Sequence, residues 1–238
     1  NMARKKLVVL TGAGISAESG FSTFRDNNGY WDKYDPEDVA SIRGWERDRQ
    51  YVLDFYNGVR EQLRDASPNR GHMLIASLEK DYDVDVITQN VDNLHERAGS
   101  TRVLHLHGEV TKVRPEKGAY DRDFSVSEVF DIGYERVDVG DLAPNGTQLR
   151  PHIVWFGEAV PNIEKAMDIV MKADIFLIVG TSLSVYPAAG LYRYVRDGVP
   201  IYVIDPKDVN LRDKRVVHIR EKAGVGMEKF IKILENSR

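Results

Sequence analysis

The chain has 238 residues, no cysteine, and 33 lysines and arginines against 37 aspartates and glutamates, a formal net charge of −4. The lack of cysteine excludes disulfides, a thiolate nucleophile, iron–sulfur clusters and cysteine-ligated zinc. The balance of charge gives no reason to expect nucleic acid as a partner, and because its apolar runs are far shorter than the roughly 20 residues that span a bilayer, we expect a cytoplasmic protein that does not enter membranes.

Short apolar runs alternate with helical patterns along the chain, which is typical of β-α units around a parallel sheet. Their continuous apolar character fits strands that are buried on both faces. The expected strands are Leu7–Leu10, Val84–Thr88, Val103–Leu106, Ile175–Val179, Ile201–Ile204 and Val216–Ile219. Apolar residues at helical spacing predict one helix over Glu46–Arg64 and another at the C-terminus, around Met227 and Leu234. The pattern predicts an α/β fold.

Two segments interrupt this alternation. Residues Arg25 to Arg47 are polar, aromatic and rich in turn signals, and we expect a long loop with at most one short helix. Residues Val110 to Leu149 carry charges and two turn signals, and they lie between strand-like segments. We expect the second segment to form a small inserted module with little core of its own.

A glycine-rich turn, G-x-G-x-x-A from Gly12 to Ala17, follows the first strand. In the dinucleotide-binding arrangement Gly12 allows the tight turn, Gly14 lets the backbone approach a pyrophosphate, and Ala17 permits close helix packing. The phosphates would then lie on free N–H groups of the helix. A tight turn without a ligand is the alternative. Because Asp32 and Asp35 fall in a loop rather than at the end of a second strand, the pattern does not predict an ordinary dehydrogenase.

Polar residues also follow three later strands, at the edge where ligands bind open α/β sheets. The three segments are Thr88-Gln89-Asn90-Val91-Asp92-Asn93-Leu94-His95, His105-Leu106-His107-Gly108 and Gly180-Thr181-Ser182. Either Asn90 or Asp92 is also suited to cap the following helix. Alternation places both histidines of the second segment on one face, and His107 is a candidate general base. A structural histidine or a metal-binding pair is the alternative.

The segment Arg150 to Glu158 places large apolar side chains next to a glycine. An extended peptide can pair its backbone along such a segment. A buried core strand explains the pattern equally well.

Taken together, these motifs resemble the sirtuins of the bacterial type, which are NAD-dependent protein-lysine deacylases. The matching segments are GAGIS at Gly12–Ser16, GFSTFR at Gly20–Arg25, TQNVDNLH at Thr88–His95, HLHGE at His105–Glu109, RPHIVWFGE at Arg150–Glu158 and GTS at Gly180–Ser182. Their shared order, from Leu7 to about Ala223, makes the resemblance specific. It implies a Rossmann-like NAD-binding domain over residues 2–24, 72–109 and 150–238, and a small domain over residues 25–71 and 110–149. An acyl-lysine peptide would bind in the cleft between them.

The resemblance also implies individual roles. The expected contacts of the pyrophosphate and its neighbouring ribose are Gly12, Ala13, Gly14 and Ser16. The loop that closes over NAD would include Ala17, Phe24 and Arg25. Around the nicotinamide the expected residues are Gln89 on the ribose, Asn90 and Asp92 in the pocket, and His107 as catalytic base. The expected adenosine contacts are Gly180, Thr181, Ser182, Asp205 and Ala223, and the expected acyl-lysine contacts are Val154, Phe156 and Gly157.

The preferred acyl group depends on Tyr56 and Arg60. Family members that prefer succinyl or malonyl groups carry a tyrosine followed three residues later by an arginine. Here Tyr56 is present, but Val59 takes the place of that arginine, and Arg60 is one position late. One residue rotates a helical side chain by about 100°. The resemblance therefore favours a deacetylase over a desuccinylase or demalonylase, with Tyr56 and Arg60 as candidate substrate contacts.

The same motifs are compatible with other functions. An ADP-ribosyltransferase on the same scaffold would release nicotinamide without a deacylated product, whereas a silent NAD- or acyl-lysine-binding module would bind without turnover. A dehydrogenase is disfavoured because the loop after Arg25 replaces its second strand. The expected partners are acyl-lysine proteins or peptides.

Most sirtuins bind a structural zinc through four cysteines in the interval that corresponds to Val110–Leu149. In this chain the interval contains neither cysteine nor histidine. We therefore expect no zinc, and a module that is held by backbone pairing and by docked apolar side chains. The expected docking residues are Val126, Val129, Phe130, Ile132 and Tyr134. Because structural zinc supplies stability rather than chemistry, we expect activity without it.

Overall fold

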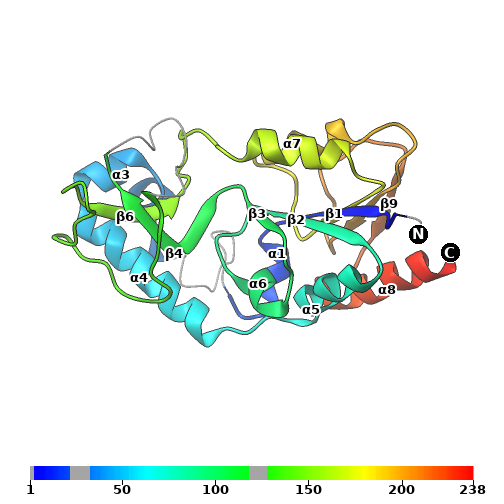
Figure 1. Cartoon of the computed structure of the whole chain (residues 1–238), viewed down its shortest axis with the longest axis horizontal. Coiled ribbons are helices and arrows are strands. Elements are labelled where there is room, and N and C mark those ends of the chain that lie inside the picture. The colour runs from blue at the N-terminus through cyan, green and yellow to red at the C-terminus, as the bar shows by residue number, and fades with distance from the viewer. Residues whose placement is uncertain (1–2, 22–32, 118–127, 238) are drawn as a thin grey trace.

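A six-stranded parallel sheet forms the larger part of the molecule (Figure 1). In spatial order its strands are β3 (Val103–His105), β2 (Asp83–Thr88), β1 (Lys6–Thr11), β7 (Ile175–Val179), β8 (Ile201–Ile204) and β9 (Val216–Ile219). The computed structural model describes residues 3–21, 33–117 and 128–237. All six strands lie within one residue of their expected bounds, so the predicted α/β fold is confirmed.

Helices cover both faces of this sheet, as the apolar runs predict. Along β1, Leu7 and Val9 belong to one core while Val8 and Leu10 belong to the other. The first core is closed by α5 (Arg70–Ser77) and α8 (Ala223–Asn236), and the second by α7 (Ile163–Met171) and the 3-10 helix η5 (Ala188–Tyr194). Figure 1 shows α7 on one side of the sheet and α5 and α8 on the other. Each fully buried Leu or Val side chain contributes about 1.5–3 kcal/mol to folding.

The order of the strands reverses between β1 and β7. The chain builds β1, β2 and β3 outward in one direction, and then returns to build β7, β8 and β9 in the other. Two short helices lie between the strands built first: the 3-10 helix η2 (Leu78–Lys80) precedes β2, and helix α6 (Leu94–Ala98) connects β2 to β3. A reversal of this kind leaves a crevice at the carboxyl ends of the two central strands, where ligands of α/β proteins bind.

A second, antiparallel sheet lies beside the first. Its strands are β5 (Phe130–Asp131), β4 (Gly108–Pro115) and β6 (Leu149–Ile153), in that order. The helices packed against it are α2 (Pro36–Val39), α3 (Ile42–Arg47) and α4 (Arg49–Asp65). Residues 150–153 pair with β4, so they lie in the second sheet, whereas the sequence assigns them to the NAD-binding domain.

The sequence prediction of one continuous helix over Glu46–Arg64 is wrong. Helix α3 ends at Arg47 and α4 begins at Arg49, because Asp48 between them has an extended backbone, with φ −156° and ψ 90°. The Asp48 carboxylate accepts a hydrogen bond of 3.0 Å from the Tyr51 N–H group and so caps α4. The segment before it holds two short helices, α2 and α3, rather than at most one.

Most of the expected docking residues lie where the sequence places them. Phe130, Ile132 and Tyr134 pack against the core of the second sheet. Val129 is half-buried, and Val126 lies outside the described residues. The described part of this cysteine-free interval thus packs apolar side chains against its neighbours.

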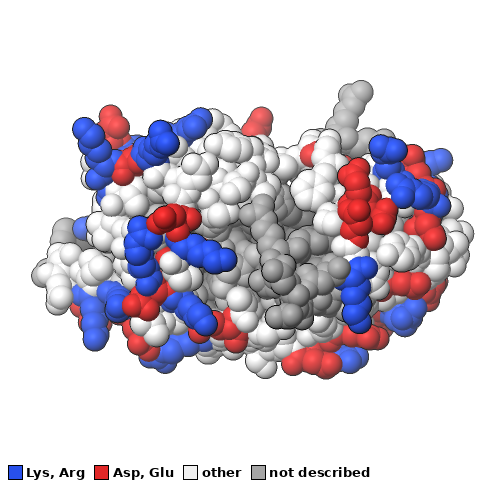
Figure 2. Space-filling view, turned by 180° about the vertical axis from the view of Figure 1, so that it is seen from behind, with Lys and Arg blue, Asp and Glu red and all other residues white. Residues whose placement is uncertain are grey.

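The surface carries both signs of charge in small groups. On the face seen in Figure 2, lysines and arginines lie close to aspartates and glutamates. Among the helices of the described ranges, none is both long and apolar enough to cross a membrane.

Candidate active site

The glycine-rich turns after β1 and β7 meet at the point where the strand order reverses. The Gly12 N–H group donates to the Val179 carbonyl at 3.0 Å, and the Gly14 N–H group donates to the Gly180 carbonyl at 2.8 Å. Helix α1 (Gly14–Ala17) begins at this contact. The structure therefore brings together two of the segments that the sequence assigns to the nucleotide.

The glycines are needed for this approach of one backbone to another. A Cβ atom on Gly14 would lie 2.8 Å from the Gly180 Cα atom, and one on Gly12 would lie 2.6 Å from the Thr181 Cβ atom. Gly180 itself has φ +68°, a left-handed conformation that glycine adopts at little cost. The missing side chain of Gly14 thus makes room for Gly180, whereas the sequence pattern alone predicts room for a pyrophosphate.

We expect Gly180→Ala to destabilise the fold by at least about 2 kcal/mol more than Gly198→Ala does. Both glycines have positive φ, so both alanines carry a backbone strain of about 1 kcal/mol. A Cβ atom on Gly180 would also lie 2.5 Å from the Ile15 nitrogen, whereas one on Gly198 meets nothing within 4 Å. Urea unfolding of the two variants measures the difference, and equal losses would show that the contact between the turns tolerates a methyl group.

Two expectations for α1 are wrong in detail. Ala17 is exposed, so its small side chain does not serve close helix packing. The N–H groups of Gly14, Ile15 and Ser16 already donate to carbonyl oxygens, so this short helix offers fewer free donors to a phosphate than the sequence predicts. Ala13, which precedes the helix, is exposed. Phe24 and Arg25, the other residues of the expected NAD loop, lie outside the described residues.

A buried polar network joins the first turn to the segment after β2. The Ser16 hydroxyl donates to the Asp92 carboxylate at 2.7 Å, and the Asn90 side-chain amide donates to the Gly12 carbonyl at 3.0 Å. Burial raises the pKa of Asp92, while the hydrogen bonds from Ser16 and from the Leu94 N–H group oppose that rise. Asp92 also accepts a hydrogen bond of 3.0 Å from the N–H group of Leu94, the first residue of α6. The N-cap residue of α6 is Asn93, so the prediction that Asn90 or Asp92 caps this helix is wrong.

The Gln89 side chain, which follows β2, contacts the turn after β7. Its side-chain amide donates to the Thr181 hydroxyl at 3.2 Å, and so links the carboxyl ends of β2 and β7. Thr11 and His95, which the sequence analysis did not single out as a pair, lie beneath these residues, with the Thr11 hydroxyl 2.9 Å from the His95 Nε2 atom. Thr11 ends β1 and His95 lies in α6, so the sequence pattern does not indicate that the two side chains meet.

His107 follows β3 and faces the same edge. Its Nδ1 atom lies 3.1 Å from the Gln89 carbonyl oxygen, which can only accept, so Nδ1 carries a hydrogen and Nε2 of the neutral ring is an acceptor. Burial lowers the pKa of His107, and the bond to Gln89 only partly opposes it, so the ring is neutral at neutral pH. This geometry suits a group that takes up a proton.

The segment expected to bind a peptide runs past His107. The Val154 N–H group donates to the His107 carbonyl at 2.9 Å, and the Phe156 N–H group donates to the Ala40 carbonyl at 3.0 Å. The Phe156 side chain is 65 % exposed, which is unusual for so large an apolar group. Gly157 is exposed with φ +87°. An exposed apolar side chain, that of Phe156, therefore lies two residues beyond the Val154 backbone that contacts His107.

Tyr56 and Arg60 are both buried inside the smaller module. The Tyr56 hydroxyl accepts a hydrogen bond of 3.0 Å from the Trp155 indole, and Arg60 donates to the carbonyls of Glu135 and Val110 at 2.8 and 3.0 Å. Burial lowers the pKa of Arg60 to about 10, so the guanidinium remains charged. Arg60 crosslinks three segments of the module, and its completely buried side chain is not presented to a substrate.

The residues expected at the adenosine end lie along β7, β8 and α8. The Thr181 hydroxyl also accepts from the Leu183 N–H group at 3.2 Å, and the Ser182 hydroxyl lies 2.9 Å from that of Ser184. Asp205 follows β8 directly and is half-buried. Ala223 begins α8 and is buried, so its backbone is the part placed for contact.

The Sir2 family model matches residues 12–187 of the chain. An NAD-dependent protein deacylase of Bacteroides thetaiotaomicron is 61 % identical over 203 residues, covering 85 % of this chain and 86 % of that protein. One of Helicobacter pylori is 53 % identical, covering 85 % of each. A Sir2 homologue solved with NAD has a TM-score of 0.84 at 37 % identity, covering 98 % of this chain and 91 % of its own. The chain belongs to the Sir2 family.

Proposed function

We propose that this protein is an NAD-dependent protein-lysine deacylase, which releases nicotinamide and transfers the acyl group of a modified lysine to ADP-ribose. The observation that carries the proposal is His107, whose Nδ1–H group is held by the Gln89 carbonyl while Nε2 stays free to accept a proton. The ring contacts the segment after β2 through Gln89, and the His107 backbone carbonyl accepts a hydrogen bond from Val154. Relatives that are named NAD-dependent protein deacylase support the same reaction.

Each group of residues has a separate task in this proposal. NAD, as the second substrate, supplies a ribose carbon that becomes reactive when its bond to nicotinamide breaks. Asn90 and Asp92 line the nicotinamide pocket, and their hydrogen bonds to Gly12 and Ser16 fix them before any ligand arrives. The acyl oxygen of the modified lysine bonds to that carbon as nicotinamide leaves. His107 accepts a proton at Nε2 from a ribose hydroxyl, which lets the hydroxyl oxygen attack the acyl carbon, and water completes the release of free lysine and O-acyl-ADP-ribose.

The nucleotide and the peptide are proposed to bind on opposite sides of His107. The turns at Gly12–Ser16 and Gly180–Ser182, together with Gln89, Asp205 and Ala223, hold the nucleotide at the reversal of strand order. Val154, Phe156 and Gly157 flank the acyl-lysine and pair with the peptide backbone. The parallel sheet and its helices thus form the nucleotide-binding domain, and the second sheet with α2–α4 forms the small domain.

We expect acetyl-lysine peptides to be deacylated with a higher kcat/KM than succinyl- or malonyl-lysine peptides of the same sequence. The acidic acyl groups need a cation in the pocket, and Arg60 is occupied by the Glu135 and Val110 carbonyls. Nicotinamide release and peptide mass, measured together, give the comparison, with the unmodified peptide as control. Faster desuccinylation would overturn this order of preference, and nicotinamide release without a deacylated product would overturn the proposed function.

We also expect the enzyme to keep its activity after treatment with a strong chelator. The chain has no cysteine, and the module that family members fasten with zinc is held here by β4–β6 pairing and by the buried Arg60. The measurement is deacylation before and after incubation with excess chelator, followed by metal analysis. Loss of activity that added Zn²⁺ restores would contradict the expectation.

A further inference from the structure

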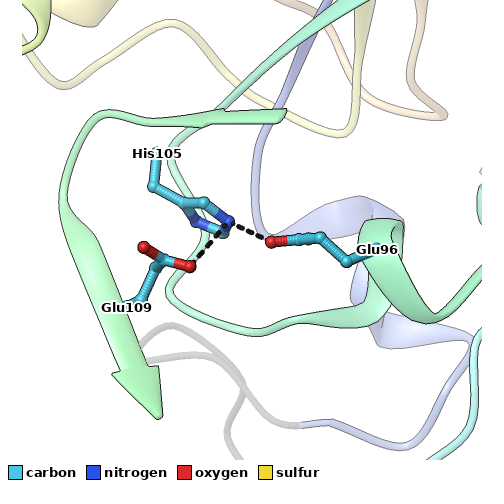
Figure 3. A group of neighbouring side chains, drawn as sticks. All are labelled: Glu96, His105 and Glu109. Carbon is cyan, nitrogen blue, oxygen red and sulfur yellow. Dashed lines mark hydrogen bonds and ion pairs between the residues drawn. The ribbon is translucent and has the colours of Figure 1, made fainter. Parts of the chain in front are cut away.

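A histidine and two glutamates, none of them assigned to the reaction, meet at the edge of the parallel sheet. Glu96 comes from α6, His105 ends β3 and Glu109 lies in β4. Figure 3 shows the three side chains pointing toward one another from these separate elements. Their potential ligand atoms, one from each residue, all lie within 4.8 Å of one another.

The two nitrogens of His105 both face acceptors. Nδ1 lies 2.9 Å from the Asn90 carbonyl oxygen, so it carries a hydrogen. Nε2 lies 2.8 Å from the Glu96 carboxylate and 3.7 Å from that of Glu109. A lone pair on Nε2 would point at two negative groups, so a positive charge must lie between them.

A proton satisfies this arrangement only in part. A hydrogen on Nε2 can bond to Glu96 at 2.8 Å, but 3.7 Å is too long for a hydrogen bond to Glu109. A tetrahedral metal ion with bonds of about 2.0–2.2 Å places its ligand atoms roughly 3.4 Å apart, between these two distances. Small rotations of Glu96 and Glu109, whose side chains are 37 % and 20 % exposed, would complete the contact with a metal.

The surroundings provide two further features of a metal site. A metal-bound histidine ordinarily donates its other ring N–H group to a carbonyl or carboxylate, as His105 does to Asn90. A cavity of about 120 Å³, large enough for water, is lined by two of the three residues, His105 and Glu109, together with His152 and Asn162.

One neighbouring cation opposes a bound metal. The Lys112 ammonium lies 2.9 Å from the other carboxylate oxygen of Glu109. Because the Lys112 side chain is 32 % exposed, it can turn toward water. With one imidazole and two carboxylates, and with this competing charge, the site suits an exchangeable ion rather than a permanently bound one.

We infer that Glu96, His105 and Glu109 bind one divalent transition-metal ion that prefers mixed nitrogen and oxygen ligands, such as Zn²⁺. This site is separate from the structural zinc site that family members carry, since none of its ligands lies in the interval 110–149. It does not depend on the proposed reaction. Through the His105–Asn90 hydrogen bond, it is connected to the segment that lines the nicotinamide pocket.

The test is a calorimetric titration of the chelator-treated, dialysed full chain with Zn²⁺. We expect one ion per chain, at least about 10-fold weaker binding for Glu96→Gln and Glu109→Gln, and no measurable binding for His105→Gln. Glu164→Gln, which removes an exposed carboxylate outside the cluster, is the matched control and should bind as the wild type does. Mg²⁺, which prefers oxygen ligands, should not bind at the same concentrations.

Thermal unfolding provides a second readout, because an ion that binds only the folded state raises Tm. Zn²⁺ should raise the Tm of the wild type and of Glu164→Gln by similar amounts, and that of Glu109→Gln by less at the same Zn²⁺ concentration. If His105→Gln does not fold, the two glutamate variants decide the question alone. No Zn²⁺ binding to the wild type, or equal binding by the wild type and both cluster variants, would overturn the inference.

Discussion

His107→Ala is expected to fold as the wild type does and to lose nearly all deacylation. A positioned general base contributes about 10²–10⁴-fold to a rate, and the half-buried His107 ring is oriented for this role by the Gln89 carbonyl. The loss should appear in kcat, because the proposed role of His107 is to accept a proton rather than to hold either substrate. Single-peptide kinetics at saturating NAD measure it.

Controls separate this chemical role from a structural one. The His107 ring makes one described hydrogen bond, to the Gln89 carbonyl, so its removal should lower the free energy of unfolding by no more than about 1 kcal/mol. NAD binding to His107→Ala, measured by calorimetry, should remain close to that of the wild type. Full activity in this variant would contradict the assignment of His107 as the base.

The strands of the large sheet could be predicted from the sequence because they are buried on both faces. Val8 and Val9 face opposite cores, and a polar side chain at either position would be buried. Consecutive residues of such a strand are therefore apolar, and the apolar run coincides with the strand. The break between α3 and α4 could not be predicted from the pattern of apolar residues. Apolar periodicity continues across Asp48, and only the capping bond from Tyr51 shows that a new helix begins there.

The site was predictable as a set of motifs but not as a set of contacts. Asp92 follows a buried strand, which marks it as a candidate, but its partner Ser16 lies 76 residues away in the chain. Gly14 illustrates the same limit, since the glycine was found correctly while the group filling its space, Gly180, could not be foreseen. Contacts between distant segments depend on the packing of the sheet, which no local pattern contains.

Buried arginines provide the crosslinks in the module that lacks zinc cysteines. Arg60, Arg114 and Arg150 are among the largest fully buried side chains of the described residues. A guanidinium carries five hydrogens in one plane, so it can bond carbonyls of several segments, as Arg60 does with Glu135 and Val110. Composition does not reveal this role, because buried and exposed arginines look alike in a sequence.

Glu158→Gln is expected to destabilise the protein by about 3–5 kcal/mol, because it leaves the buried Arg150 without its counter-charge. Arg150 binds both carboxylate oxygens of Glu158, at 2.9 and 3.0 Å, and lies 3.7 Å from the centre of the Trp155 ring. Arg136→Ala, which removes a pair on the surface of the same module, is the matched control and should cost no more than about 1 kcal/mol. Urea unfolding at pH 7 measures both.

The pH dependence of stability gives an independent check on the same pair. Burial raises the pKa of Glu158, but the hydrogen bonds and the charge of Arg150 outweigh it, so the folded pKa lies below the ordinary 4.5. The contribution of the pair is therefore complete above pH 4.5 and is lost as the pH falls through the folded value, a loss that Glu158→Gln should not show. The double variant Arg150→Met/Glu158→Gln should recover part of the stability, because it leaves no unpaired charge at this position. A double variant less stable than Glu158→Gln would show that Arg150 stabilises the module through its carbonyl and ring contacts rather than through this carboxylate.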